Sequence, residues 1–160
     1  MPLAEAAETV DYAATAFLIL CASLVLLMTI PGLALFYGGM TRTKSVLNMM
    51  MMSFGAMGVV GIIYVLYGYS MSFGSENVGG IIANPFEKFG LASTDTIINP
   101  FGYEGYGNIP ELAFVGFQLT FAVITVALIS GAVADRVKFS TWMVFAALWV
   151  TFAYFPIAHM

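Results

Sequence analysis

A stripe of phenyl rings is the feature of this sequence most suited to doing chemistry. Phe114, Phe117 and Phe121 recur at intervals of three and four residues, which places them on one face of a helix, with Gln118 beside them. The face of an aromatic ring attracts a cation by about 0.5 to 2 kcal/mol, which is enough to hold the ion briefly. Stripes of this kind also pack against neighbouring helices, so the pattern alone leaves cation binding and packing both open.

Other reactive side chains are scarce. The sequence has one histidine, His159, and one cysteine, Cys21. A redox enzyme that holds haem needs pairs of histidines, so this composition disfavours that class. The run from Met49 to Met52 covers all sides of a helix, which favours adaptable packing over a metal site. We therefore expect no enzyme activity, no cofactor and no metal.

Four long apolar segments must position the stripe. Hydrophobic residues make up 61% of the 160 residues and charged residues only 9%, and the mean hydropathy is +0.93. A helix needs about 20 apolar residues to cross the hydrocarbon core of a membrane. The sequence predicts an all-α, polytopic membrane bundle with spans at about 12–40, 46–73, 111–134 and 139–159. The net charge of -4 argues against a nucleic-acid partner.

Four of the basic residues orient the bundle. Arg42 and Lys44 lie in one short connection, and Arg136 and Lys138 lie in another. Short loops rich in Lys and Arg remain on the cytoplasmic side, so we expect a multi-pass protein of the plasma membrane with its N-terminus outside. The start of the chain is acidic, unlike a secretory signal, so the first span is expected to stay in the protein.

Most acidic residues belong to the opposite side. They precede the first span or lie between the second and third spans: Glu5, Glu8, Asp11, Glu76, Glu87, Asp95, Glu104 and Glu111. An outer face of this kind has a negative potential that concentrates cations. Residues 74–110 are expected to form a compact outer loop, with short helices around 85–89.

Small and interfacial residues give further local expectations. Pro31 predicts a kink in the first span. Gly55, Gly58 and Gly61 form a stripe that predicts close contact with other helices. Trp142, near the inner end of the last span, is typical of an interfacial belt.

Several longer motifs resemble one family. They are the run from Thr29 to Gly39 followed by a basic turn and Val46 to Met49, then AFVGFQLTFAVIT at 113–125, GAVADRVKFS at 131–140 and YFPIAHM at 154–160. In this order they resemble the N-terminal portion of the ammonium transporter family, Amt/Mep/Rh. The resemblance covers essentially the whole chain.

The resemblance implies a homotrimer of eleven-span subunits, each with its own pore, of which four spans are present here. By motif matching, Phe117 resembles a residue of the outer ammonium-recruitment site, and Phe121 resembles the outer of two stacked rings that gate the pore. Phe36 and Tyr37 resemble residues on the inner part of the path, and Gln118 is a further candidate lining residue. Ammonium would be recruited, deprotonated and passed as ammonia, with a cytoplasmic regulatory protein as a further partner.

Two alternatives stay open at this point. A sensor of ammonium built on the same fold would share every residue of these motifs. The chain could also be an incomplete, non-conducting fragment, because the family's recruitment tryptophan, conserved aspartate, paired histidines and inner phenyl gate would all follow Met160. We therefore expect that these 160 residues alone do not conduct.

Overall fold

Four long helical segments dominate the structure, a computed structural model that describes residues 9–100, 102 and 107–160. They run over Tyr12–Met40, Val46–Phe73, Glu111–Val133 and Phe139–His159, and each is long and apolar enough to cross a membrane. The expectation of an all-α bundle with four membrane-spanning helices is confirmed. Glu5, Glu8 and Glu104, which were expected on the outer side, lie outside the described residues.

The first segment bends at its proline. Helix α1 (Tyr12–Leu27) passes through a π-helical stretch, Met28–Leu33, into α2 (Ala34–Met40). Pro31 has no backbone N–H to donate, and the residue before it, Ile30, has non-helical angles of φ -134° and ψ 109°. The Ile30–Pro31 peptide bond is cis. The kink expected in this segment is therefore present.

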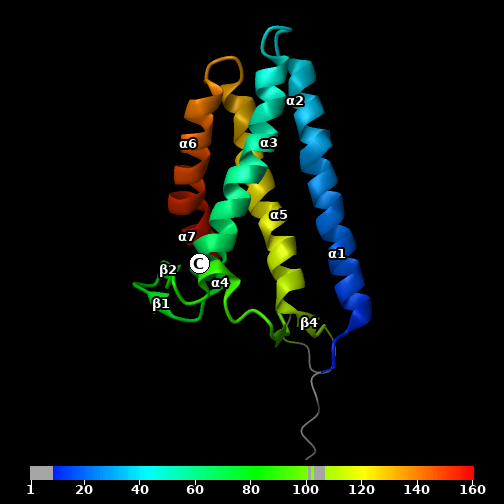
Figure 1. The fold of residues 1–160 in the computed structure, drawn as a ribbon, viewed down its shortest axis with the longest axis vertical. Coiled ribbons are helices and arrows are strands. Elements are labelled where there is room, and N and C mark those ends of the chain that lie inside the picture. The colour runs from blue at the N-terminus through cyan, green and yellow to red at the C-terminus, as the bar shows by residue number, and fades with distance from the viewer. Residues whose placement is uncertain (1–8, 101, 103–106) are drawn as a thin grey trace, which may run out of the picture.

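The other three segments also change helical type along their length. Helix α3 (Val46–Ile63) continues through a π-helical stretch into α4 (Tyr69–Phe73). Helix α5 (Glu111–Ile129) ends in a 3-10 turn, Ser130–Val133. Helix α6 (Phe139–Trp149) passes through Val150–Tyr154 into α7 (Phe155–His159). Both connections that contain the basic pairs lie at one end of the bundle, and the loop between α4 and α5 lies at the other (Figure 1).

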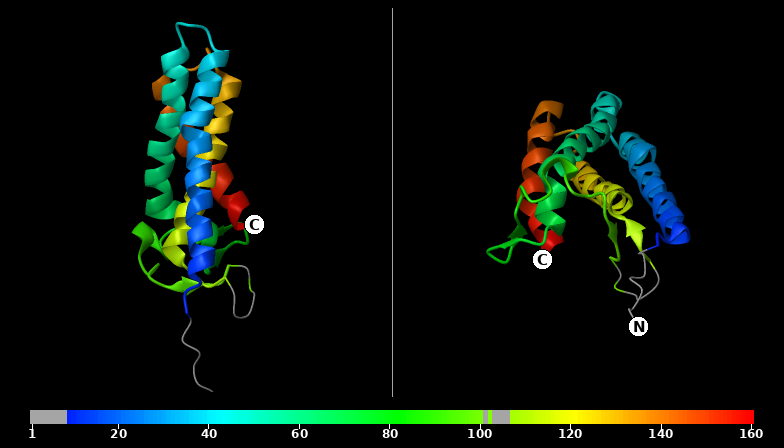
Figure 2. Two further views of the ribbon diagram at one scale, coloured as in Figure 1. Left: turned by 90° about the vertical axis from the view of Figure 1, so that its right-hand side faces the viewer. Right: turned by 60° about the horizontal axis from the view of Figure 1, so that its bottom comes forward.

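Helix α3 is the central element. It packs against α2, α5 and α6, while α1 packs mainly on α5, and Figure 2 shows the helices from two further sides. The buried side chains of α3 follow a spacing of three and four residues: Met49, Met52, Ser53, Ala56 and Val60. The apolar members of this set meet Val123 and Val126 of α5 and Trp142 and Ala146 of α6 in one apolar core.

Trp142 is not in an interfacial belt, and that expectation is wrong. Its side chain is completely buried between α6 and α3. The indole N–H donates to the backbone carbonyl of Met52 at 2.9 Å, which satisfies the one polar group of the ring inside the core. Apolar patterning near a helix end cannot distinguish this buried tryptophan from one that faces the membrane surface.

The glycine stripe of α3 makes close contact at one position only. A Cβ atom on Gly55 would lie 2.7 Å from the sulfur of Met143 and 2.9 Å from the Phe139 ring. Within the described residues, a Cβ on Gly58 or Gly61 would have no neighbour within 4 Å. The expected close contact is therefore found at Gly55, and for Gly58 and Gly61 it stays a prediction. Gly68, further along the same segment, lies directly under the Phe155 ring.

The loop between α4 and α5, expected to be the outer loop, is built from short strands as well as turns. Strands β1 (Asn77–Val78) and β2 (Ile82–Ala83) pair antiparallel, as do β3 (Ile97–Ile98) and β4 (Ile109–Pro110). Residues 85–88 form a turn, and the helical turn is a 3-10 helix at Phe89–Leu91. The short helix therefore lies at Phe89–Leu91, a few residues after the expected position around 85–89. The strands were not predicted from the sequence.

Two acidic residues organise the backbone at this end. The Asp11 carboxylate caps α1 by accepting from the N–H of Ala14 at 2.9 Å, and the amides of Ala14 and Gly107 lower its pKa. The Glu87 carboxylate accepts from the hydroxyl and amide of Ser75 and from the amide of Glu76. The Ser75 hydroxyl, followed by these amides, holds the pKa of Glu87 below its usual range.

We predict that Gly68→Ala destabilises the protein and that Gly58→Ala does not. The new methyl group at position 68 would overlap the Phe155 ring, whereas position 58 is open within the chain. Overpacking of this kind costs about 1 to 3 kcal/mol, and alanine is otherwise the better helix former. Thermal unfolding of the detergent-solubilised protein measures the difference. Equal transition temperatures for the two variants would show that α4 and α7 do not pack as described.

Candidate functional site

Helix α5 has two different faces. Val115, Ala122 and Val126 are buried towards the core. Phe117 and Phe121 are four residues apart and so share one side of the helix, and their positions relative to the buried residues place that side opposite the core. The Phe121 side chain is 38% exposed and Phe117 is half-buried. The phenyl stripe is thus not sealed inside the contacts of these four segments.

The two rings contact each other edge to face. Their centroids are 4.9 Å apart and their planes are inclined at 75°. This geometry places the positive edge of one ring against the negative face of the other, which is a favoured arrangement. The contact between the rings covers only one of their four faces, and the Phe121 side chain is partly exposed.

The hydroxyl groups near the rings are bonded within α5. Thr120 donates to the carbonyl of Phe117 at 2.7 Å, and Thr125 donates to the carbonyl of Phe121 at 2.6 Å. A Thr hydroxyl that is bonded to its own helix offers no free proton to a passing group. The surface around the rings is therefore mostly apolar and aromatic.

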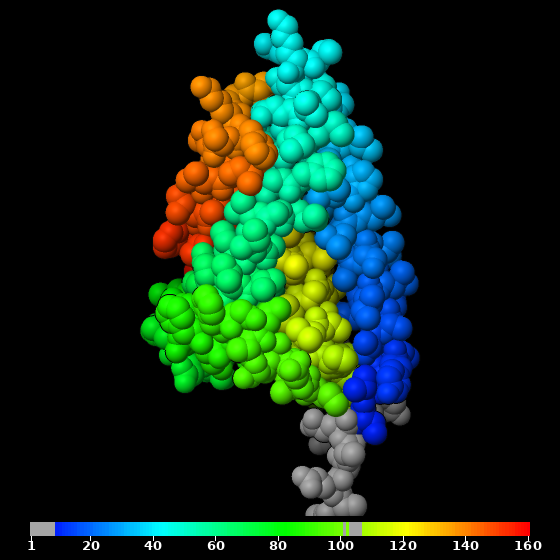
Figure 3. Space-filling view, viewed as in Figure 1, coloured from blue at the N-terminus to red at the C-terminus, as the bar shows by residue number. Residues whose placement is uncertain are grey.

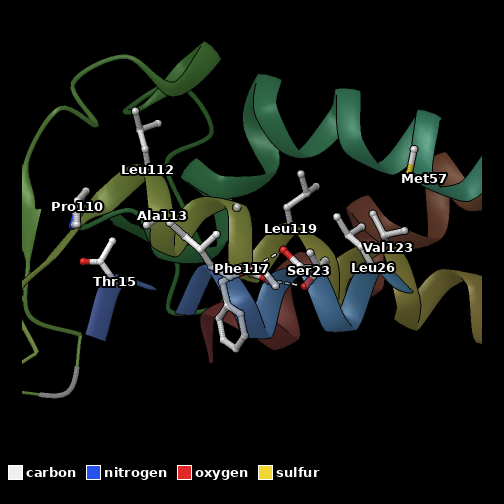
Figure 4. A pocket seen from close by; sticks show the side chains of 14 residues that line it. Thr15, Ser23, Leu26, Met57, Pro110, Leu112, Ala113, Phe117, Leu119 and Val123 are labelled. Carbon is white, nitrogen blue, oxygen red and sulfur yellow. Dashed lines mark hydrogen bonds between the residues drawn. The ribbon is translucent and has the colours of Figure 1, made fainter. Parts of the chain in front are cut away.

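Two cavities lie beside Phe117, one on each side of the contact between α1 and α5. The larger, of about 720 Å³, lies between α1, α3 and α5 and includes Ser23, Met57 and Gly116 in its lining. It corresponds to the hollow in Figure 3 through which α5 is visible between α1 and α3. The smaller, of about 280 Å³, includes Phe17 and Cys21 of α1. In Figure 4 the Phe117 ring points away from the side to which Leu112 and Leu119 point.

The inner candidates lie along the same side of α5. The Tyr37 hydroxyl donates to the carbonyl of Leu128 at 3.0 Å. Leu128 follows Phe121 by seven residues, so it occupies the same face about 10 Å further along the helix. The Tyr37 ring also packs on Gly131, where a Cβ would approach it to 2.6 Å.

Phe36 and Tyr37 differ in environment although they are neighbours. Their ring centroids are 5.6 Å apart, and the Phe36 side chain is 61% exposed. A cavity of about 400 Å³ at the inner end is lined by Tyr37, Met40 and Asp135, among others. The structure therefore joins Tyr37 to the inner end of α5 and leaves Phe36 on the surface of this chain. Gln118 is half-buried on α5, on the side that also presents Phe114.

One polar cluster at the outer end was not found from the sequence. The Glu111 carboxylate, only 1% exposed, accepts hydrogen bonds from Tyr69, Lys88 and Thr96. Glu111 was expected among the acids that give the outer face its negative potential, but burial and pairing with Lys88 remove it from that role. The sequence feature that could have indicated this cluster is Lys88, the one Lys or Arg outside the two basic connections.

A metal site is not evident in the part of the chain that the structure describes. No three His, Cys, Asp or Glu side chains among those residues come together in a group that could hold a metal ion. His159 is instead placed with its Nδ1 atom 3.2 Å from the backbone carbonyl of Ser72, which links α7 to α4.

Four apolar spanning helices and an exposed aromatic face define a polytopic helical membrane protein. The chain belongs to the Ammonium Transporter Family, whose model matches residues 16–160. An ammonium transporter of Mycobacterium tuberculosis is 54% identical over 155 residues, which cover 91% of this chain and 32% of that protein. An ammonium transporter of Aquifex aeolicus is 45% identical over 149 residues, covering 93% and 34%. The chain thus spans about one third of the length of these relatives.

Solved structures share the arrangement of the helices. The crystal structure of Saccharomyces cerevisiae Mep2 matches with a TM-score of 0.76 and 29% identity over 94% of this chain and 33% of that one. The Mep2 mutant delta442 of Candida albicans matches with a TM-score of 0.72 and 27% identity, covering 96% and 36%. The resemblance to the N-terminal portion of the family is confirmed.

We predict that Tyr37→Phe lowers the free energy of unfolding by about 0.5 to 1.5 kcal/mol. The variant keeps the ring on Gly131 and removes only the donor to the Leu128 carbonyl. Tyr12→Phe is the matched control, because that side chain is 82% exposed. Chemical or thermal unfolding measures both variants. A Tyr37→Phe protein as stable as the control would mean that the inner end of α1–α2 is not tied to α5 by this bond.

Proposed function

We propose that the complete protein transports ammonium across the plasma membrane, using the outer aromatic face of α5 to recruit the cation. The single observation that carries this proposal is the pair of contacting rings of Phe117 and Phe121 on the face of α5 opposite the core. Membership of the Ammonium Transporter Family supports the substrate.

Recruitment and passage make different demands on the site. A cation is held by ring faces with about 0.5 to 2 kcal/mol, so it can bind at Phe117 and leave again. A bare charge at the centre of a bilayer costs at least about 2.5 to 3.5 kcal/mol on insertion scales, and a neutral molecule avoids this cost. We propose that ammonium gives one proton to a water molecule of the outer solution near Phe121, forming hydronium, and that the remaining ammonia continues along the apolar side of α5 towards Tyr37.

Deprotonation also explains how potassium would be rejected. Potassium and ammonium ions have similar sizes, so a pore that selects by size alone would pass both. Potassium cannot lose a proton and would have to cross the apolar stretch as an ion. The Thr120 side chain, which lies beside the rings, is buried, so its oxygen would not replace the water shell of the ion.

The remaining parts of the proposal concern assembly and orientation. We propose a homotrimer with the N-terminus outside, the two basic connections in the cytoplasm and a cytoplasmic regulatory protein as a further partner. The placement of both basic connections at one end of the bundle supports this orientation.

We predict that Phe121→Ala in the complete protein raises the KM for methylammonium uptake by about two- to thirtyfold, the range that corresponds to a lost cation–ring attraction of 0.5 to 2 kcal/mol. Cells that lack other ammonium uptake, supplied with radiolabelled methylammonium, allow this measurement. Phe145→Ala is the matched control, since Phe145 has the same exposure of 38% on α6. Potassium uptake is measured in the same cells. Unchanged methylammonium uptake together with unchanged potassium rejection would rule out the role assigned to Phe121.

A further inference from the structure

An ion pair between a buried carboxylate and a partly exposed lysine lies at the outer end of the helix that presents the aromatic face. Glu111 is the first residue of α5, and its carboxylate is almost completely enclosed. It pairs with the Lys88 ammonium group and accepts from the hydroxyls of Tyr69 at 2.7 Å and Thr96 at 2.6 Å. A carboxylate enclosed in this way requires such partners, because an unpaired buried charge is strongly unfavourable.

The four residues of this Glu111 cluster come from separate parts of the chain. Tyr69 belongs to α4 at the outer end of the second span, Lys88 lies in the turn after β2, and Thr96 immediately precedes β3. The backbone N–H of Glu111 also donates to the carbonyl of Thr96 at 2.9 Å. These hydrogen bonds and the ion pair therefore join the first turn of α5 to the second span and to two segments of the outer loop.

A row of aromatic rings runs from the Glu111 cluster to the side of α5 that presents Phe117. The Lys88 Nζ atom lies 5.7 Å from the centre of the Tyr69 ring. That ring stacks on Phe73 at 5.5 Å, and Phe73 meets Phe114 edge-on at 5.2 Å. Phe114 precedes Phe117 by three residues, so the two side chains are neighbours on the surface of α5.

Packing beside Phe117 is open. The two cavities next to its ring, of about 720 and 280 Å³, lie on the sides of α5 that face α1. Contacts with α1 therefore leave space around this part of α5. The Glu111 cluster lies six residues, or about 9 Å, before Phe117 and joins this part of α5 to the loop and to the second span.

We propose that Glu111 and Lys88 are positioning residues for cation recruitment: their ion pair fixes the outer turns of α5, and with them the Phe117 ring, against the outer loop. This proposal rests on the proposed function. It differs from a general role in folding because it predicts an effect on substrate affinity that is separate from the amount of folded protein.

The test uses the complete protein in liposomes, with methylammonium uptake measured over a range of concentrations and divided by the amount of folded transporter. Glu111→Gln and Lys88→Met each remove one charge of the pair. We expect each to raise KM about three- to tenfold with Vmax changed less than twofold, and we expect the double variant to be no worse than the poorer single variant. Lys88→Arg keeps the charge, so its KM should be closer to that of the unmodified protein than the KM of Lys88→Met is.

The matched control is Asp95→Asn. It removes a carboxylate from the same loop at an exposed position outside the Glu111 cluster, and its KM should remain within twofold. If Glu111→Gln does not fold, Tyr69→Phe and Thr96→Val remove one hydrogen bond each without leaving a lone charge. Each of these two variants should raise KM about twofold.

Hydrogen exchange gives a readout that does not depend on transport. We expect Glu111→Gln to speed exchange of the amides in residues 112–118 while those of α6 stay unchanged. Normal uptake by the unmodified protein, with KM unchanged in the charge-removing variants, would overturn the positioning role alone. An unmodified protein that takes up no methylammonium would overturn the proposed function, and the recruitment role of the ion pair with it.

Discussion

The close approach of α3 to its neighbours is the constraint on which the rest of this structure depends. Lipid is as apolar as the helices, so helices associate in a membrane through tight packing and hydrogen bonds and not through burial from water. Helix α3 meets this requirement with Gly55 under Met143 and Phe139, and with Ala56 and Val60 in the core. The indole of Trp142 adds a hydrogen bond to the α3 backbone.

This packing decides which side of α5 remains free. Because α3 takes the face of α5 that contains Val115, Ala122 and Val126, the rings of Phe117 and Phe121 are left on the other side. The Tyr37 hydroxyl then bonds to the carbonyl of Leu128 on that same side, about two helical turns further in. The pair of rings near one end of α5 and the tyrosine near its other end are thereby placed along one helix.

The sequence predicted the features that depend on local patterns and missed those that depend on distant pairing. Four helices follow from the length of the uncharged segments, the bend follows from Pro31, and the nearness of Phe117 to Phe121 follows from their spacing. The pairing of Lys88 with Glu111 joins residues 23 positions apart through an irregular loop, and no periodicity encodes it. The burial of Trp142 and the open space at Gly58 likewise depend on which helix lies opposite, and apolar composition does not determine that.

A structure of the complete protein in a lipid bilayer, determined in the presence of ammonium, would test most directly whether the outer face of α5 lines a route for the substrate. We expect the Phe117 and Phe121 rings to border a passage that opens to the outer solution and continues along α5 towards Tyr37. We also expect density for a cation within about 6 Å of a ring centre. Rings that are instead covered by another helix or by lipid, with no passage beside them, would show that the phenyl stripe serves only for packing.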